Sequence, residues 1–439
     1  MPEILMNPQI TAAAVLVVCY LILFTEKLNR AVVALLGASA MIFLGVLTQK
    51  TAIAGIDFNT ISLLIGMMII VGIAEKSGMF EYAAIYSAKL VKASPRGILA
   101  ALALVTAVFS ALLDNVTTVL LIVPVTFQIT RSLKLTPYPF LILEIFASNI
   151  GGTATLIGDP PNILIGSALG LSFMDFVYEL TPVVIINMAV LILIFDFFFG
   201  RKMEAAAADK IRITGINEAE SITDKKLLFK SLSVLFLVIA GFIMAEHWHM
   251  QNGTIALFGA ALLLFLYTLG DTHQQRDQKV SQAFASVDWT TIFFFCGLFS
   301  IVYGLEETGV LYMLGQKFIE ITGGSIQKAT FGVLWVSAFV SAAIDNIPFV
   351  ATMIPTLKSM EPALGGREAM MPVWWALSLG SCFGGNGSLI AASANVIVAG
   401  LAHREGHPIG FARFLIWAMP VMILSVVIST VYLYLIHFI

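Results

Sequence analysis

Two Asp-Asn pairs stand inside long apolar runs of this 439-residue sequence. Asp114 and Asn115 interrupt the run SALLDNVTTVLLIVP, and Asp345 and Asn346 interrupt the run SAAIDNIPFVATMIP. In a lipid bilayer a carboxylate costs about 2.5–3.5 kcal/mol on insertion scales unless it is paired, hydrated or protonated. A carboxyl group that is kept neutral can release a proton and take it up again. The two pairs are therefore candidates for proton transfer and for binding a small polar solute.

The proton-transfer role depends on what surrounds the carboxyl groups in the sequence. No Lys or Arg stands beside either aspartate, and the nearest basic residues, Arg131 and Lys358, fall at the ends of predicted spans. Burial without a cationic partner favours the neutral acid, which releases its proton when water or a cation reaches it. The alternative is a protonated helix cap. Asp159 in GDPPN and Glu144 in FLILEIF are two further candidates for proton coupling, and Asp159 is alternatively a cation ligand or an N-cap.

Polar and glycine residues near each pair are candidates for binding the solute. Each pair is followed along the chain by an interrupted apolar stretch, GGTATLIGDPPN in one case and GGNGSLIAASAN in the other. Breaks in membrane helices leave backbone N–H and C=O groups that side chains, water or a ligand must satisfy. In the alternative interpretation, Asn, Ser and Thr only join helices and Gly only permits close packing. The predicted substrate-binding residues are Asn115, Thr117, Thr118, Gly151, Gly152, Thr153, Asn162, Asn346, Gly385, Asn386, Ser388 and Asn395.

The composition requires a membrane environment for most of the chain. Hydrophobic residues make up 59% of the sequence and charged residues 12%, and the mean hydropathy is +0.94. A net charge of -3 without a basic tract argues against nucleic acid as a partner. We find no nucleotide-binding fingerprint and no catalytic triad, so we expect neither an enzyme nor a cofactor. Three well-separated cysteines, Cys19, Cys296 and Cys382, indicate neither a metal site nor a disulfide framework.

The two halves of the chain repeat each other. An offset of 231 residues aligns the two Asp-Asn runs, and an offset of 233 aligns the two glycine-containing stretches. In a sequence this rich in apolar residues, apolar matches arise easily by chance, whereas polar, Gly and Pro matches do not. We therefore predict a tandem duplication, with a first repeat at 1–199, a polar linker at 200–230 and a second repeat at 231–439. The matched residues include Asp57 with Asp288, Gly66 with Gly297, Glu75 with Glu306 and Pro124 with Pro355.

Each repeat contains an odd number of predicted crossings. The two arms around an Asp-Asn pair lack a polar turn long enough to reach water, so we predict a re-entrant hairpin whose tip is held inside the protein. Five crossings per repeat make the repeats inverted. The expected fold is an all-α polytopic membrane protein with about ten spans and two re-entrant hairpins. The segments of the first repeat are spans near 10–25, 31–47 and 59–75, a surface helix at 80–92, a hairpin at 96–130, an interrupted span at 138–172 and a final span at 176–199; the second hairpin is 328–360 and the second interrupted span is 372–402.

The distribution of basic residues gives an orientation. With both termini outside and the linker in the cytoplasm, most of the 24 Lys and Arg residues fall inside, and Arg30 is counted there as a loop charge. This agrees with the positive-inside rule, and it places the protein in the cell's inner (plasma) membrane as a multi-pass protein. The basic residues left outside are Lys50, Lys317, Lys328, Lys358 and Arg367.

The two DN-containing hairpins, each followed by a Gly-Gly interrupted span, resemble the arsenite permease and NhaD-type antiporter family of the ion transporter superfamily. DNIPFVATMIP and GGNGSLIAASANVIVAGLA are especially similar to the pigmentation-associated P protein, a eukaryotic relative in that family. The resemblance implies a scaffold domain and a transport domain that work by an elevator-type movement. It implies a secondary transporter that exports arsenite or antimonite in exchange for protons.

Two other functions stay open at this stage. A site with two aspartates and no fixed cation is a poor host for a di- or tricarboxylate, but it suits Na⁺ as well as a neutral trihydroxide, so Na⁺/H⁺ antiport is one alternative. A channel-like anion or pH-regulating module is another. The expected partners are a small inorganic substrate, protons and the lipid bilayer, and a homodimer and a cytoplasmic ATPase subunit on the linker also stay open.

Overall fold

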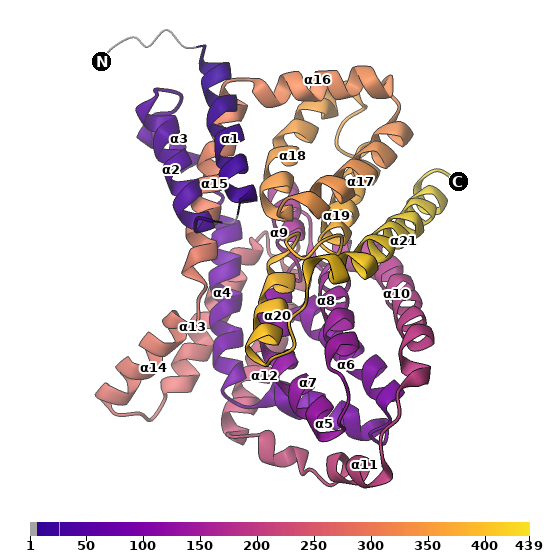
Figure 1. Ribbon diagram of the computed structural model, residues 1–439. Helices are drawn as coiled ribbons and strands as arrows, with labels where there is room; N and C mark the ends of the chain where they lie inside the picture. The colour runs from indigo at the N-terminus through magenta and orange to yellow at the C-terminus, as the bar shows by residue number, and fades with distance from the viewer. Residues whose placement is uncertain (1–6, 26) are drawn as a thin grey trace.

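The chain folds into helices, and the part described by this computed structural model, residues 7–25 and 27–439, contains no strand (Figure 1). Seven helices in this described part are long and apolar enough to cross a membrane. Their sequences carry few charged residues, so their outer faces can contact lipid. Their backbone N–H and C=O groups are hydrogen-bonded within each helix. They are α4 (Phe58–Glu75), α6 (Pro95–Leu112), α10 (Phe173–Phe198), α12 (Lys225–Met244), α15 (Trp289–Glu307), α17 (Ile326–Ala343) and α21 (Phe411–His437).

The remaining helices are shorter or less apolar, and three shorter ones are apolar. These three are α1 (Pro8–Phe24), α2 (Arg30–Phe43) and α13 (Asn252–Thr268). The other helices are α3 (Gln49–Ala54), α5 (Met79–Leu90), α7 (Asn115–Ser132), α8 (Tyr138–Gly152), α9 (Pro160–Leu169), α11 (Ala207–Thr214), α14 (His273–Ala285), α16 (Val310–Thr322), α18 (Asn346–Met360), α19 (Met371–Gly384) and α20 (Ser393–Arg404), with 3₁₀ turns η1 (Gly200–Lys202), η2 (Glu218–Ser221) and η3 (Glu361–Ala363).

Each Asp-Asn pair lies where one helix ends and the next begins. α6 ends at Leu112 and α7 begins at Asn115, while α17 ends at Ala343 and α18 begins at Asn346. The aspartate is the N-cap in both cases: its carboxylate accepts backbone N–H groups that the first helical turn leaves unpaired. The carboxyl groups are thus fixed at the start of α7 and α18.

The glycine-containing stretches form two further breaks. α8 ends at Gly152 and α9 resumes at Pro160, and α19 ends at Gly384 and α20 resumes at Ser393. The side chains of α8 are all buried, so this helix lies in the centre of the molecule. The two irregular connections are held inside protein, as backbone at this depth must be.

Glycines let these central helices approach their neighbours. A Cβ atom at Gly151 would collide with the backbone of Ala107 on α6, and one at Gly384 would collide with the backbone of Ala338 on α17. Because no side chain fits, Gly151 and Gly384 serve helix packing of the small-residue kind found in membrane proteins.

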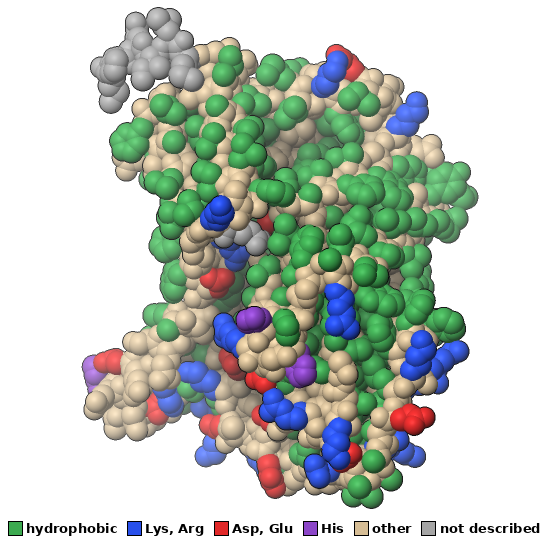
Figure 2. All heavy atoms as spheres, viewed as in Figure 1, with side chains coloured by type: hydrophobic (Ala, Val, Ile, Leu, Met, Phe, Trp, Pro, Cys, Tyr) green, Lys and Arg blue, Asp and Glu red, His purple; other side chains and the backbone are tan. Residues whose placement is uncertain are grey.

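The two ends of the molecule differ in charge. Figure 1 places α1, α3 and α16 at the upper end and α5, α11 and α14 at the lower end. Figure 2 shows that Lys, Arg, Asp and Glu side chains gather at the lower end, whereas hydrophobic side chains cover the flanks and most of the upper part.

The predicted linker is attached to the preceding part of the chain rather than free. Its α11 carries Asp209, which pairs with Lys134 at 3.2 Å, and Thr223 donates its backbone N–H to the carbonyl of Ser77 at 3.1 Å. Within the predicted linker 200–230, Asp224 caps α12, and that helix begins at Lys225.

A second ion pair fixes the linker to α5. Lys89 donates to the carboxylate of Glu218 and, at 3.0 Å, to the carbonyl of Ile216. The hydrogen bond from Lys89 holds the pKa of Glu218 below its usual value. The pair therefore stays ionised at neutral pH and is lost only as the pH falls through that lowered pKa.

Candidate functional site

A cavity of about 230 Å³ lies where the starts of six helices, α2, α7, α9, α15, α18 and α20, converge. α7 and α9 come from the first half of the chain and α15 and α18 from the second, and α20 closes one side. We call it the acidic cavity. Its polar lining residues are Arg30, Asp114, Asn115, Thr117, Asp159, Ser286, Asp288, Thr291, Asn346 and Ser393.

Asp114 faces this cavity while it caps α7. Its carboxylate accepts the backbone N–H of Thr117 at 2.7 Å and the hydroxyl of Thr117 at 2.6 Å. The side chain thus has the structural role of a cap and is also a wall of the cavity. Both sequence-based interpretations of Asp114 fit this position.

Asp345 differs from Asp114 because it faces a cation. Nη1 of Arg30 lies 3.6 Å from its carboxylate, although no basic residue is near Asp345 in sequence. The expectation that Asp345 is buried without a cationic partner is therefore wrong, and so is the description of the site as lacking a fixed cation. The physical reason is that α2 begins at Arg30 beside the start of α18, a contact between segments far apart in the sequence.

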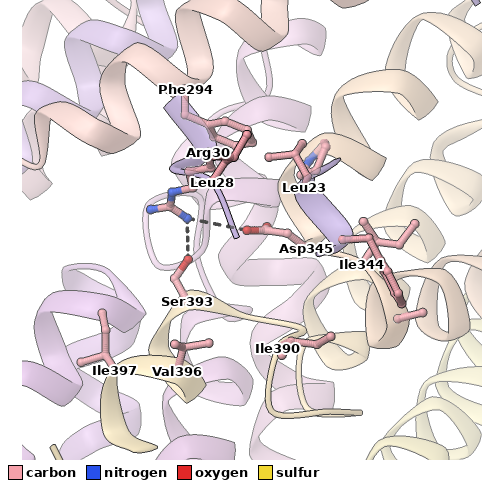
Figure 3. A pocket seen from close by; sticks show the side chains of 13 residues that line it. Leu23, Leu28, Arg30, Phe294, Ile344, Asp345, Ile390, Ser393, Val396 and Ile397 are labelled. Carbon is pink, nitrogen blue, oxygen red and sulfur yellow. Dashed lines mark hydrogen bonds and ion pairs between the residues drawn. The ribbon is translucent and has the colours of Figure 1, made fainter. Parts of the chain in front are cut away.

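Arg30 binds groups from three helices besides its own. It donates to the hydroxyl of Ser393 at 2.7 Å and lies 3.6 Å from Asp345 (Figure 3). It also donates to the hydroxyl of Thr291 at 2.7 Å and lies 3.6 Å from Asp288. Sequence reasoning missed Arg30, since it looked like a loop charge. The match of Asp288 with Asp57 across the repeats was a signal for Asp288 that went unused.

A second, larger cavity of about 380 Å³ lies on the other side of Arg30. Figure 3 shows the apolar side chains of Leu23, Phe294 and Ile344 around it, with Asp345 pointing toward the guanidinium. We call it the apolar cavity. Arg30, Ser393 and Ile397 line both cavities and form the wall between them.

Asp159 is the most buried carboxyl group of the acidic cavity, with 1% of its surface exposed. It stands at the N-cap position of α9, but its carboxyl group accepts no hydrogen bond from that helix, so the side chain itself does not cap α9. One oxygen accepts the amide of Asn115 at 3.4 Å, and the other has no hydrogen-bond partner within the described residues. Such a group is free to bind a proton or a solute.

A chain of amides connects the two halves next to the cavity. Asn149 accepts the amide of Asn115 at 3.3 Å and donates to Asn386 at 2.9 Å and to Asn395 at 3.0 Å. Asn386 is fully buried, and its amide nitrogen has no partner among the residues that the structure describes. Asn386 lies beside the site but does not line it.

Two predicted substrate-binding amides are instead used inside the protein. Asn162 donates to the carbonyls of Thr153 and Thr155 at 3.0 and 2.9 Å, and Asn395 donates to those of Gly385 and Ser388 at 2.7 and 2.9 Å. Both side chains hold the irregular connections after α8 and α19. Neither lines either cavity.

The other predicted substrate-binding residues also fall into two groups, those that line a cavity and those that make internal contacts. Asn115, Thr117 and Asn346 line the acidic cavity, and Thr118 is buried without a hydroxyl partner within the described ranges. The rest make internal contacts: Thr153 donates to the carbonyl of Asn149, Ser388 donates to that of Ala342, and Gly151, Gly152 and Gly385 pack against neighbouring backbone or side chains.

Glu144 lies away from both cavities, in the middle of α8. It is 1% exposed, and its one hydrogen-bond donor is the hydroxyl of Thr126 on α7 at 2.5 Å. The second carboxyl oxygen has no partner among the described residues. A carboxyl group buried without a cation fits a neutral, protonated state.

Comparison with known proteins assigns the chain to a family. Residues 20–380 match the family model described as "Citrate transporter". The chain belongs to the citrate transporter family. As a member, it is a helical membrane transporter, which agrees with the seven candidate spans.

Relatives in this transporter family cover almost the whole chain. "Uncharacterized transporter Rv2684" of Mycobacterium tuberculosis is 42% identical over 435 residues, which cover 98% of this chain and 99% of that protein. The P protein of Sus scrofa is 32% identical over 511 residues, which cover 98% of this chain and 60% of P protein. The similarity to P protein that the sequence predicted is confirmed, while the narrower assignment to arsenite permeases or NhaD-type antiporters stays a prediction.

Solved transporter structures share the fold. The Alcanivorax borkumensis YdaH transporter gives a TM-score of 0.64 at 13% identity, covering 98% of both chains. Neisseria gonorrhoeae MtrF, described with a class of antimetabolite efflux pumps, gives 0.60 at 11% identity and covers 100% of this chain and 96% of its own. At these identities the likeness concerns the fold alone.

Proposed function

We propose that this transporter exports arsenite and antimonite, as the neutral trihydroxides, in exchange for protons. The observation that carries the proposal is the lining of the acidic cavity, which combines carboxyl groups, amides, hydroxyls and one guanidinium. A neutral trihydroxide offers O–H donors to the carboxylates and oxygen acceptors to the guanidinium and amides. It also bears no charge that either kind of group would repel.

Protons are assigned to the carboxyl groups that have no cationic partner. Asp345 and Asp288 face Arg30, whereas Asp114 and Asp159 make no ion pair within the described residues. Asp114 and Asp159 are therefore the first proton carriers in the proposal, with Asp345 and Glu144 as further groups. Release of a proton would follow when solute or water reaches the cavity.

Na⁺/H⁺ antiport is the second candidate, because three aspartates line the acidic cavity against one arginine. Carboxylate oxygens are good ligands for a hard cation. The opposing observation is Arg30, whose fixed positive charge would repel Na⁺ from the same space.

Citrate, the solute in the family's description, fits the lining less well. A tricarboxylate in the acidic cavity would meet Asp114, Asp159 and Asp288, and the one guanidinium is already shared by two carboxylates. Like charges at such distances oppose binding. A channel-like anion or pH-regulating module would likewise have to bring anions past these carboxylates.

The proposed exchange mechanism has two inverted repeats, 1–199 and 231–439, which together form a scaffold domain and a transport domain that moves in an elevator-type cycle. Equivalent residues make equivalent contacts: Ser110 donates to the carbonyl of Ser148 at 2.6 Å, and Ser341 donates to that of Ser381 at 2.7 Å. The surface helices α5 and α16, which follow matched segments, lie at opposite ends of the molecule (Figure 1).

A flux panel tests the proposed substrate. The purified protein is reconstituted into liposomes with an imposed pH gradient, and uptake of arsenite, ²²Na⁺, citrate and chloride is measured in parallel. Arsenite uptake should follow the proton gradient with a fixed coupling ratio, and collapse of the gradient by a protonophore should stop accumulation. Sodium transport without arsenite transport would replace the proposal by Na⁺/H⁺ antiport, and gradient-independent chloride flux would indicate a channel.

A further inference from the structure

We propose that Arg30 is a tethered cation that sets the selectivity of the acidic cavity by occupying the place a free alkali cation would take. The inference deepens the proposed function, because it names the residue that lets the cavity accept a neutral solute and reject Na⁺. It follows from the contacts of the guanidinium, its place between the cavities and a comparison of the two repeats.

The guanidinium is surrounded by the kind of atoms that would bind a metal cation. Its neighbours are the hydroxyl oxygens of Ser393 and Thr291 at 2.7 Å and the carboxylates of Asp288 and Asp345 at 3.6 Å. Hard cations bind oxygen ligands of these types. In this transporter the positive charge at the centre of the oxygen atoms belongs to the protein itself.

The position of Arg30 is fixed from several sides. It begins α2, where the side chain of Asn29 accepts the N–H of Ala31 and caps the helix. The guanidinium lies over the ring of Phe294 at 5.6 Å, and about a quarter of the side chain is exposed. It is therefore held in place and also lines the acidic cavity.

In the second repeat, the helix that corresponds to α2 begins without a residue equivalent to the positively charged Arg30. The matched glycines Gly66 and Gly297 contact Ala256 and Ala34 respectively, so α13 corresponds to α2. With these alanines aligned, Asn252 takes the place of Arg30. The duplicated helix begins with a neutral side chain, so the arginine is a feature of one half-site and not of the shared fold.

Removing the charge should therefore convert the arginine's place into a cation site. Arg30→Gln leaves two hydroxyl and two carboxylate oxygens around an unoccupied position. Arg30→Lys keeps the positive charge. The matched control is Arg131→Gln, since Arg131 is exposed and makes its one ion pair with Glu405, away from both cavities.

The test compares thermal unfolding of the purified full-length variants in NaCl and in choline chloride at equal ionic strength. Wild type, Arg30→Lys and Arg131→Gln should unfold at the same temperature in both salts. Arg30→Gln should show a saturable rise of several degrees that Na⁺ produces and choline does not, because a ligand that binds only the folded state stabilises it. The same variant should gain ²²Na⁺ uptake in liposomes.

Each other outcome counts against the inference. If Arg30→Gln responds to Na⁺ no more than Arg131→Gln, or if wild type responds equally, Arg30 does not exclude sodium. Failure to recover Arg30→Gln in either salt, while the double variant Arg30→Gln/Asp345→Asn is recovered, means that sodium does not replace the guanidinium. These results are independent of arsenite flux by wild type, so loss of the proposed substrate would leave the selectivity result standing.

Discussion

Asp114 and Asp345 occupy equivalent positions at the starts of α7 and α18, yet their environments differ. Asp114 is satisfied by Thr117 alone, through its backbone N–H and its hydroxyl, whereas Asp345 accepts the N–H of Ile347 and faces Arg30. An ion pair favours the charged form of a carboxyl group. We therefore expect the carboxyl group of Asp114 to exchange protons more readily than that of Asp345.

Asp114→Asn should separate the cap from the proton carrier. Asn is as good an N-cap as Asp, so the variant should keep the wild-type unfolding temperature. Proton-driven arsenite uptake should fall about tenfold or more, because a loss of about 1.4 kcal/mol of coupling free energy already lowers uptake by a factor of ten. The measurement is uptake in liposomes across a range of pH, and a wild-type pH profile would mean that Asp114 is only a cap.

Glu144 allows a second test at this scale, because it is buried outside both cavities. Glu144→Gln keeps the shape and the acceptor for the Thr126 hydroxyl but removes the titrating group. If Glu144 carries protons, the variant should fold normally and lose proton-driven uptake. Thr126→Val is the control, since it removes the hydrogen bond and keeps the carboxyl group. Unchanged uptake in Glu144→Gln would restrict Glu144 to a structural role.

At the scale of elements, the connections after α8 and α19 are each held in shape by a side chain from the same half of the chain. Asn162 and Asn395 each bond two carbonyls of the connection that precedes their helix, and Asn162 also accepts the hydroxyl of Ser378 at 2.6 Å. These amides therefore hold the shape that brings Asp159 and Ser393 to the cavity wall.

Substitution of the amides should distinguish this structural role from binding. Asn162→Ala leaves two buried carbonyls without partners and should lower the free energy of unfolding by about 1–3 kcal/mol. Asn346→Ala, at the cavity wall, should instead weaken arsenite binding by a similar energy, roughly five- to hundred-fold in affinity. Unfolding curves and binding titrations of both variants make the comparison. The reverse pattern would contradict the division of roles drawn from the contacts.

At the scale of the whole molecule, the sequence predicted the helix breaks because matching polar residues recur along it at fixed offsets. It could not predict Arg30, because that residue stands between two apolar segments like an ordinary loop charge. α2 has 14 residues and is thus about 21 Å long, short of the roughly 30 Å of a bilayer core. Its first residue lies beside the start of α18, where Arg30 faces Asp345. The contacts of Asn162 also escaped prediction, since they depend on how the connection folds back on its own helix.

The orientation predicted from the charges can be tested on the linker. Ala207 is exposed at the start of α11, so a cysteine placed there should react without disturbing the core. In cells, Ala207→Cys should react with membrane-permeant reagents only. Labelling of intact cells by an impermeant reagent would reverse the topology and set it against the positive-inside rule.

The pair between Asp209 and Lys134 joins α11 to the residues directly after α7, so the linker is tied to the base of the first hairpin. A rotation or shift of that hairpin would carry α11 with it. A fluorophore on Arg212→Cys, which is exposed on α11, would therefore report hairpin movement as a change in energy transfer to an acceptor on α14. Turnover could be watched in single molecules in this way, from a surface far from the solute.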